Sequence, residues 1–361
     1  MRTTRLAGPA GRALASRAVG LVFALFTVGR VAVAHGQGTS PSTGGIAPGS
    51  FGTGEAKSRP EHVEEDLIGT PRDIRTVPRA PTLPDLTHRA PELSFEHTAA
   101  SVKPRTTGPV DPSTARLTSH LFNFDFELPV TSWLYGGSTW GFSAARAAES
   151  DTASFVAGQP LIFARVVRSA FHEKYAIGAG LGFSPPVFSY GDDSEAARLE
   201  AGSASTLVSV VRPWDVSTFL DRRFTTRPWI DLRVAFRRFV VQARQGFDAN
   251  LRSSGAACAE NEVCERAGDL QLISTTTLYA AWQPRREIAV GIEAWQVYLL
   301  KTRSDAADDK RSALALSPSV RFYYRWVEPA VSLLFPVGPP LLGAADSYYA
   351  LRFDLRMWFG R

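Results

Sequence analysis

The side chains best suited to chemistry are charged residues that occupy every second position of apolar segments. Alternate residues of a strand point to one face, so these side chains would share one surface. Paired carboxylates could act as an acid and a base, and arginine's planar fork pairs well with carboxylates. The set holds five acids and six arginines: Asp125, Glu127, Asp231, Glu293 and Asp354, with Arg233, Arg237, Arg321, Arg325, Arg352 and Arg356.

Three interpretations of this charged set stay open. A structural network of ion pairs is favoured, because the two signs nearly cancel. A narrow charged path for a solute is the second interpretation. A catalytic carboxylate pair is the third, and it is disfavoured because neighbouring arginines would keep both acids ionised.

Metal and cofactor chemistry finds no support in the sequence. No HExxH, no CxxC pair and no EF-hand spacing occurs, so neither a metal site nor a cofactor is expected. The two cysteines, Cys258 and Cys264, lie six residues apart in a polar stretch rich in Gly and Ala. In an oxidising compartment such a pair is expected to close a small disulfide loop.

The N-terminal segment predicts that the chain is exported. Basic residues precede the apolar run 18–28, and Ala32-Val33-Ala34 follows, which is the order of a secretory signal peptide. The apolar run is about eleven residues long, well short of the ~20 that span a bilayer as a helix. We expect cleavage after Ala34, giving a signal peptide over 1–34. Its five arginines account for the whole net charge of +5, so charge gives no reason to expect a nucleic-acid partner.

Residues 35–116 are expected to form a disordered tail. They are rich in Pro, Gly, Ser and Thr and show no sustained apolar period, so they cannot bury enough apolar surface to offset chain entropy. Two alternatives remain for this segment: it binds a partner, or it folds into the interior of the following domain as a plug.

Residues 117–361 alternate apolar and polar side chains with a period of two, which predicts strands. Gly178, Gly180 and Gly182 fall at alternate positions of one strand, where they would let a bulky group pack against its inner wall. The connection 213–227 is unusually long for its side of the barrel, which indicates either a helical turn within it or an error in the strand count there. Ten strands are expected, within a range of about 8–12: 117–128, 158–168, 174–184, 204–212, 228–241, 268–283, 286–300, 312–326, 329–336 and 347–359.

The connections between these strands, and the tryptophans, favour a membrane barrel over a soluble β-sandwich. Short turns at 169–173, 284–285 and 327–328 alternate with long polar connections, as in outer-membrane barrels. Five tryptophans fall at strand ends on the short-turn side, where an aromatic girdle contacts lipid headgroups. They are Trp214, Trp229, Trp282, Trp326 and Trp358.

The histidines do not form a hydrolase site in this arrangement. His35, His62, His88 and His97 precede the expected barrel. His120 at the start of the first expected strand and His172 in a short turn are both expected at the periplasmic end. Ser119 and His120 would point to opposite faces of a strand, so they cannot act as nucleophile and base.

The last segment, which alternates up to Phe359, resembles the final strand of bacterial outer-membrane β-barrels, although Gly360 and Arg361 extend beyond the aromatic residue. The resemblance covers about 117–361 and is one of architecture. It implies an all-β, antiparallel transmembrane barrel in a Gram-negative outer membrane, with lipid and the barrel assembly machinery as partners. A periplasmic partner could bind residues 35–116.

The function expected from this architecture is non-enzymatic: a membrane scaffold, or a narrow channel or transport component whose interior is filled largely by its own side chains. Two alternatives remain, an outer-membrane hydrolase of unrecognised type and a soluble exported β-sandwich that binds a partner.

Overall fold

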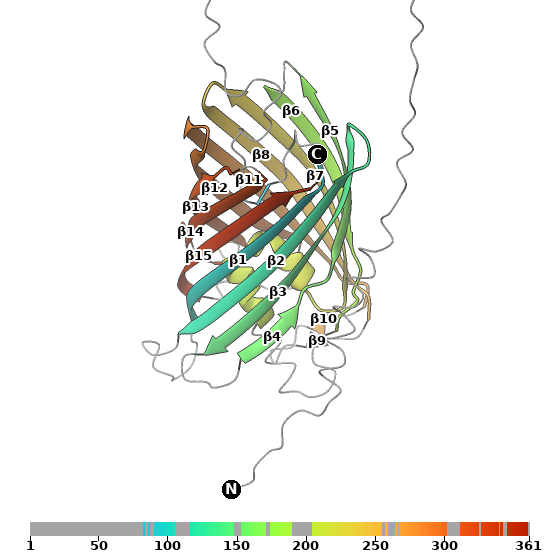
Figure 1. Ribbon diagram of the computed structural model, residues 1–361. Helices are drawn as coiled ribbons and strands as arrows, with labels where there is room; N and C mark the ends of the chain where they lie inside the picture. Colours follow the sequence, from blue (N-terminus) through green and yellow to red (C-terminus); the bar gives the residue numbers. More distant parts are fainter. Residues whose placement is uncertain are drawn as a thin grey trace, which may run out of the picture. The chain divides into compact units, whose positions relative to one another are not determined.

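The alternating segments form strands that close into a barrel (Figure 1). The computed structural model describes residues 82–83, 86, 90–104, 116–147, 153–170, 174–189, 204–254, 257–258, 264–265, 267–301, 311–324, 326–338, 340–341 and 345–359. The predicted signal peptide, the tail up to residue 81, His172 and Arg325 therefore lie outside the described residues.

Twelve antiparallel strands make the wall of the barrel. Their order follows the chain, and the last strand pairs with the first. The strands are β1 (Glu92–Pro104), β2 (Leu117–Pro129), β3 (Leu134–Ala147), β5 (Leu161–Ala170), β6 (Tyr175–Ser184), β7 (Arg223–Phe236), β8 (Phe239–Arg252), β11 (Leu270–Arg285), β12 (Ile288–Lys301), β13 (Ser312–Phe322), β14 (Val327–Pro336) and β15 (Ala345–Trp358).

The closed register confirms the predicted antiparallel barrel and excludes the β-sandwich. Glu92 at the start of β1 lies opposite Glu127 of β2 and opposite Trp358 at the end of β15. The first strand therefore begins, and the last strand ends, at one end of the barrel. The short turns lie at this same end, which we call the short-turn end. The other end, which we call the long-loop end, carries the longer connections.

The strand count is twelve rather than about ten because three strands were missed and one was assigned wrongly. β1 lies in the predicted tail and β3 in the predicted loop 129–157. Both have small and polar residues on much of their surface, which weakens the apolar alternation. The predicted strand 228–241 spans two strands, β7 and β8, which join in a tight turn at Arg237, whose φ is +51°.

Because β1 precedes β2, the strand predicted at 117–128 runs between the two ends of the barrel in the opposite direction to the one expected. His120 lies toward the long-loop end of β2, not at the periplasmic end that the missing first strand had implied. The structure also moves the start of the barrel from residue 117 to Glu92.

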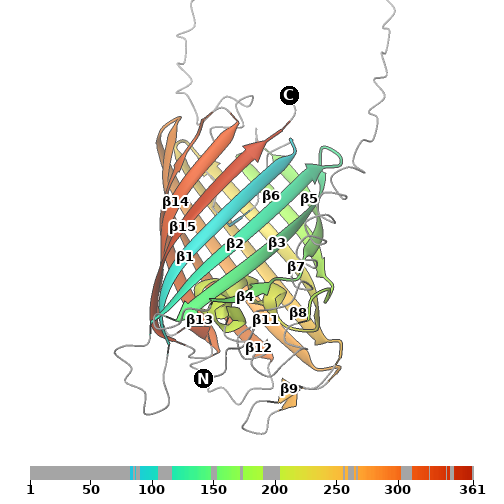
Figure 2. The same ribbon diagram turned by 60° about the horizontal axis from the view of Figure 1, so that its bottom comes forward.

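The predicted strand 204–212 is instead helical. A helix over 204–211 leads into the 3-10 helix η2 (Pro213–Phe219), which confirms the helical turn, one of the two explanations for the long connection. Figures 1 and 2 show both helical pieces inside the barrel, toward the long-loop end. We call residues 204–219 the inward loop.

Two short elements complete the strands. β4 (Ala153–Ala157) pairs with the half of β3 at the long-loop end, and β5 pairs with the half at the short-turn end, so they line the same wall on either side of a break at 158–160. β9 (Ala257–Cys258) and β10 (Cys264–Glu265) form a separate two-stranded ribbon in which Cys258 lies opposite Cys264.

The outer surface of the wall is apolar. Leu232, Ile230, Phe353 and Leu351 are among the large apolar side chains exposed there. Only apolar surroundings make such a continuous exposed surface favourable, so it matches the lipid-facing band of a membrane barrel. Among the described residues, no helix is long and apolar enough to cross a bilayer.

The predicted aromatic girdle is partly wrong. Trp282 and Trp326 are exposed at the short-turn end. Trp358 lies there at the end of β15, but it shares the inward face of Asp354 and Arg356, and its Nε1 donates a hydrogen bond to Glu92 at 3.2 Å. Trp214 and Trp229 are buried inside the barrel instead. A strand-end position in the sequence does not distinguish an outward ring from an inward one. Trp133, in the turn between β2 and β3, is an exposed ring at this end that the sequence analysis missed.

Arginine at Leu232 tests the outward face. We expect Leu232→Arg to lower the free energy of unfolding by about 2–4 kcal/mol, because the charge would enter hydrocarbon near the bilayer midplane. Phe239→Arg is the matched control: Phe239 is also exposed but borders a short turn, so its cost should be about 0–1 kcal/mol. Reversible denaturant unfolding in lipid vesicles measures both, and equal stability of the two variants would contradict the face assignment.

Candidate functional site

The interior of the barrel is charged. The structure places seven of the predicted residues on the inner face and buries them: Asp231, Arg233, Glu293, Arg321, Arg352, Asp354 and Arg356. Asp125 and Glu127 line an internal cavity. Arg237 is wrongly predicted, because it lies exposed in the turn between β7 and β8.

One group of ion pairs crosses β12 to β15. Arg352 contacts Glu293 at 3.0 Å, and Arg321 contacts Asp354 at 2.9 Å. Arg321 also contacts Glu328 of β14 at 3.3 Å. Glu328 was missed because it was assigned to a short turn, although its side chain points inward and is buried. The side chains of these pairs are buried in the interior beside β12 to β15.

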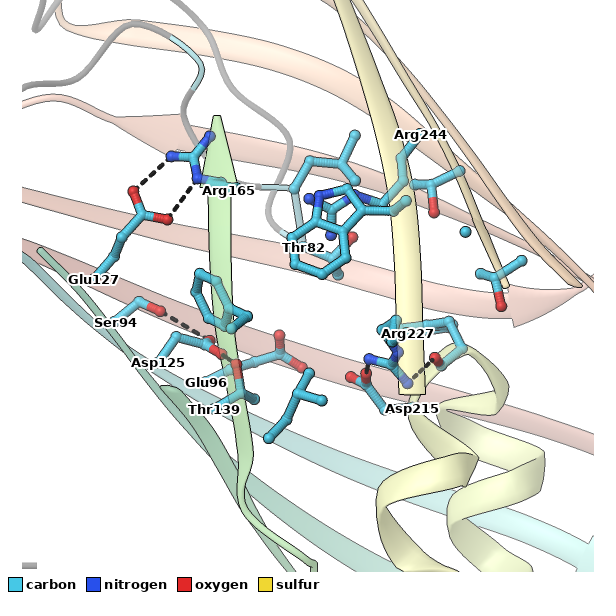
Figure 3. A pocket seen from close by; sticks show the side chains of 18 of the residues that line it. Thr82, Ser94, Glu96, Asp125, Glu127, Thr139, Arg165, Asp215, Arg227 and Arg244 are labelled. Atoms are coloured by element: carbon cyan, nitrogen blue, oxygen red, sulfur yellow. Dashed lines mark hydrogen bonds and ion pairs between the residues drawn. The ribbon is translucent and has the colours of Figure 1, made fainter. Parts of the chain in front are cut away.

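A cavity of about 140 Å³ lies on the other side of the interior. Figure 3 shows its charged lining, with Asp125, Glu127 and Glu96 from β1 and β2, and Arg165, Arg227 and Arg244 from β5, β7 and β8. Glu127 receives two hydrogen bonds from Arg165, at 2.5 and 2.7 Å. Such bidentate pairs fix both side chains.

The strand pattern of the sequence could have identified one of these arginines but not the other two. Arg165 occupies a position within a correctly predicted strand, so its strand periodicity could have identified it. Arg227 and Arg244 fell in segments taken as connections, because the β7–β8 hairpin was not recognised.

The inward loop is tied to the wall by charge. Arg212 donates hydrogen bonds to Glu96 of β1 and, at 2.5 Å, to Asp215 in η2. Arg227 of β7 contacts Asp215 at 2.9 Å and Asp248 of β8 at 2.7 Å. Burial alone would raise the pKa of Asp215, but the guanidiniums of Arg212 and Arg227 hold that pKa below its usual value. The carboxylate therefore remains ionised between two arginines.

Aromatic contacts also hold the inward loop against the barrel wall. The Trp214 ring stacks on Trp295 of β12 with centroids 4.1 Å apart and an interplanar angle of 13°. The Phe219 ring packs against the wall at Gly141 and Gly158, where an added Cβ would come within 2.9 and 3.1 Å of it. The two glycines thus allow the close approach of Phe219.

A second segment enters the interior from the N-terminal side of β1. Thr82 donates a hydrogen bond to Glu293, and Trp295 donates one to Thr82 at 3.2 Å. The backbone carbonyl of Leu83 accepts from Arg356 at 3.4 Å. This location supports the plug alternative for this part of the predicted tail.

The glycines of β6 behave as predicted. A Cβ on Gly178 would lie 3.1 Å from Leu86, and one on Gly182 would lie 3.0 Å from Leu161. A Cβ on Gly180 would overlap the Trp229 indole. The bulky groups that these glycines accommodate are therefore a side chain from the segment before β1 and two from the wall.

The histidines in the described strands do not reach the interior. Ser119 is buried inside while His120 is exposed outside, as expected from strand geometry. His120 Nδ1 lies 3.2 Å from His97 Nε2 on the outer surface. Each imidazole thus has a polar partner on an otherwise apolar wall. In the part of the chain that the structure describes, no group of three or more His, Cys, Asp or Glu residues is arranged to hold a metal ion.

Comparisons with known proteins identify the architecture. No protein-family model matches the chain, and no curated protein matches it significantly in sequence. Among solved structures, the chain is similar to the COG4313 outer membrane channel from Pseudomonas putida F1, with 10% identity and a TM-score of 0.54 over 75% of this chain and 96% of that one. The β domain of the Bordetella autotransporter BrkA is 10% identical, with a TM-score of 0.43 over 75% of this chain and 100% of that one. The similarity to the Pseudomonas channel, together with the closed sheet, shows that the chain has the fold of a bacterial outer-membrane β-barrel.

Proposed function

We propose that this protein is a non-enzymatic outer-membrane channel or transport component whose interior is closed at rest by two internal segments. The observation that carries this proposal is the charged cavity that both the inward loop and the segment before β1 help to line. A scaffold needs no solvent-sized space among its interior charges, whereas a transport protein needs a place for its solute.

The ion pairs of the interior support the same proposal. A twelve-stranded barrel is wider than the eight-stranded barrels that side chains alone can fill, and narrower than water-filled porins. The charged network, with the two internal segments, would fill most of this width and leave a restricted polar path. Displacement of the inward loop would widen that path without breaking the wall.

The location and the remaining segments are part of the proposal. Export would depend on residues 1–34, with cleavage after Ala34, and the barrel assembly machinery would insert the protein in the outer membrane. Residues 35–81 would then extend into the periplasm, where a partner could bind them and act on the adjoining segment at Thr82. Mass measurement of the purified protein tests the leader: a chain that begins at His35 is expected, and one that retains Met1 would contradict cleavage.

Loosening the inward loop should open the channel. We expect Arg212→Ala/Trp214→Ala to raise single-channel conductance in planar bilayers by roughly twofold or more, because it removes the ion pairs and the stacked ring that hold the loop in the lumen. Trp282→Ala is the matched control, since Trp282 lies exposed on the outer wall.

The control variant should conduct like the wild type. Both variants must migrate faster unboiled than boiled on a gel, which shows that the barrel is folded. If the double variant is folded and its conductance equals that of the wild type, the inward loop does not close the channel.

We also propose that Cys258 and Cys264 form a disulfide in the loop between β8 and β11. Directly opposite residues of an antiparallel pair have Cα atoms about 4.5–5.5 Å apart, which falls within the disulfide range. The register of β9 and β10 supports the proposal. In protein purified from the envelope without reductant, we expect neither cysteine to react with iodoacetamide before reduction and both to react after it. Alkylation of both before reduction would exclude the disulfide.

A further inference from the structure

The cavity is lined by one more carboxylate than arginines, and Asp125 is the carboxylate that no described arginine contacts. Six carboxylates and five arginines line it. Five of the carboxylates have an arginine within 4.0 Å: Glu92, Glu96, Glu127, Asp215 and Asp248. Asp125 has no arginine or lysine within that distance among the residues that the structure describes.

Neutral groups hold the Asp125 carboxylate instead. It accepts hydrogen bonds from Thr139 at 2.5 Å and from Ser94 at 3.0 Å, and the Asn123 amide lies 3.3 Å from Oδ2 and 3.4 Å from Oδ1. Arg212 attracts it only at longer range, because the contacts of Arg212 are to Glu96 and Asp215. Asp125 is therefore oriented toward the cavity by three neutral donors and lacks a cation.

We propose that the cavity binds a small organic ammonium ion, whose charged group pairs with Asp125. An ionised carboxylate inside a membrane protein is costly unless a cation accompanies it. An ammonium group supplies a positive charge at contact distance from Asp125, which the described wall does not.

The rest of the lining favours an organic cation over a metal ion or an anion. Phe163, Trp214 and Trp229 line the same cavity and give the carbon part of an organic cation apolar surface to contact. A metal ion needs several ligands, and the described residues include no group of three His, Cys, Asp or Glu suited to one. An anion would compete with carboxylates for arginines that are already paired. The volume of about 140 Å³ limits the ligand to a small molecule.

This inference rests on the proposed transport function and names the class of its solute. Binding is tested with the full-length protein in detergent micelles at neutral pH, by titration calorimetry with phenethylammonium. Two analogues with the same phenylethyl group, phenylethanol and phenylpropanoate, replace the ammonium group with a neutral and an anionic one. We expect the ammonium to bind at least about tenfold more tightly than either analogue, because only it carries a charge that pairs with the Asp125 carboxylate.

The variants assign the site. Asp125→Asn should weaken binding of phenethylammonium at least about tenfold, whereas Asp125→Glu, which keeps the charge, should retain most of it. Glu287→Gln is the matched control, because it removes one carboxylate in a short turn outside the cavity and should leave binding unchanged. Each variant is first shown to be folded by its faster migration before boiling.

The outcomes separate this inference from the proposed function. Equal binding to wild type and to folded Asp125→Asn, tighter binding of phenylpropanoate, or no binding to the wild type would each overturn the ammonium site. Bilayer conductance of the same preparations reports on the channel independently. A conducting protein that does not bind the ammonium loses only the solute class, while a binding protein that never conducts loses the channel.

Discussion

Closure of the sheet is the constraint on which the rest of the structure depends. In lipid, backbone N–H and C=O groups find no water, so a strand-built protein must pair its last strand with its first. Here β15 pairs with β1, and the wall holds twelve strands. That number creates an interior wider than the wall side chains of the smallest barrels can fill. The interior must therefore be filled by paired charges and by additional chain.

The inner surface follows from this need. Arginines reach across the inner surface and pair with carboxylates of other strands, as Arg352 of β15 does with Glu293 of β12. The inward loop and the segment at Thr82 meet the same wall residues, since Trp295 stacks on Trp214 and donates a hydrogen bond to Thr82. Both internal segments therefore contact Trp295 of the wall. The cavity lies beside them and is lined by residues of both segments. The described carboxylate without an arginine, Asp125, lines that cavity.

The sequence predicted the architecture better than the interior. β15, whose apolar and polar residues alternate throughout, could be located from its period of two. Its inward charges Arg352, Asp354 and Arg356 were named correctly, because the period also fixes the face. β1 and β3 were not predicted, because small and polar residues interrupt the apolar alternation of these strands. The segment 204–211 contains Leu207 and three valines, a composition that predicts a strand. It is helical in the structure because its burial inside the barrel outweighs this local propensity. Trp214 and Trp229 show the same limit: pairing partners far along the chain decide whether a strand-end ring points to lipid or inward.

Amide hydrogen exchange of the folded protein tests the central claim most directly, which is that the inward loop is a packed part of the interior. Residues 207–219 are buried against β1, β3, β7 and β12. The account predicts that amides of 207–219 exchange nearly as slowly as those of the wall strands, and much faster in Arg212→Ala/Trp214→Ala, while the wall stays protected. Rapid exchange of this segment in the wild type, at the rate of an exposed loop, would contradict the account.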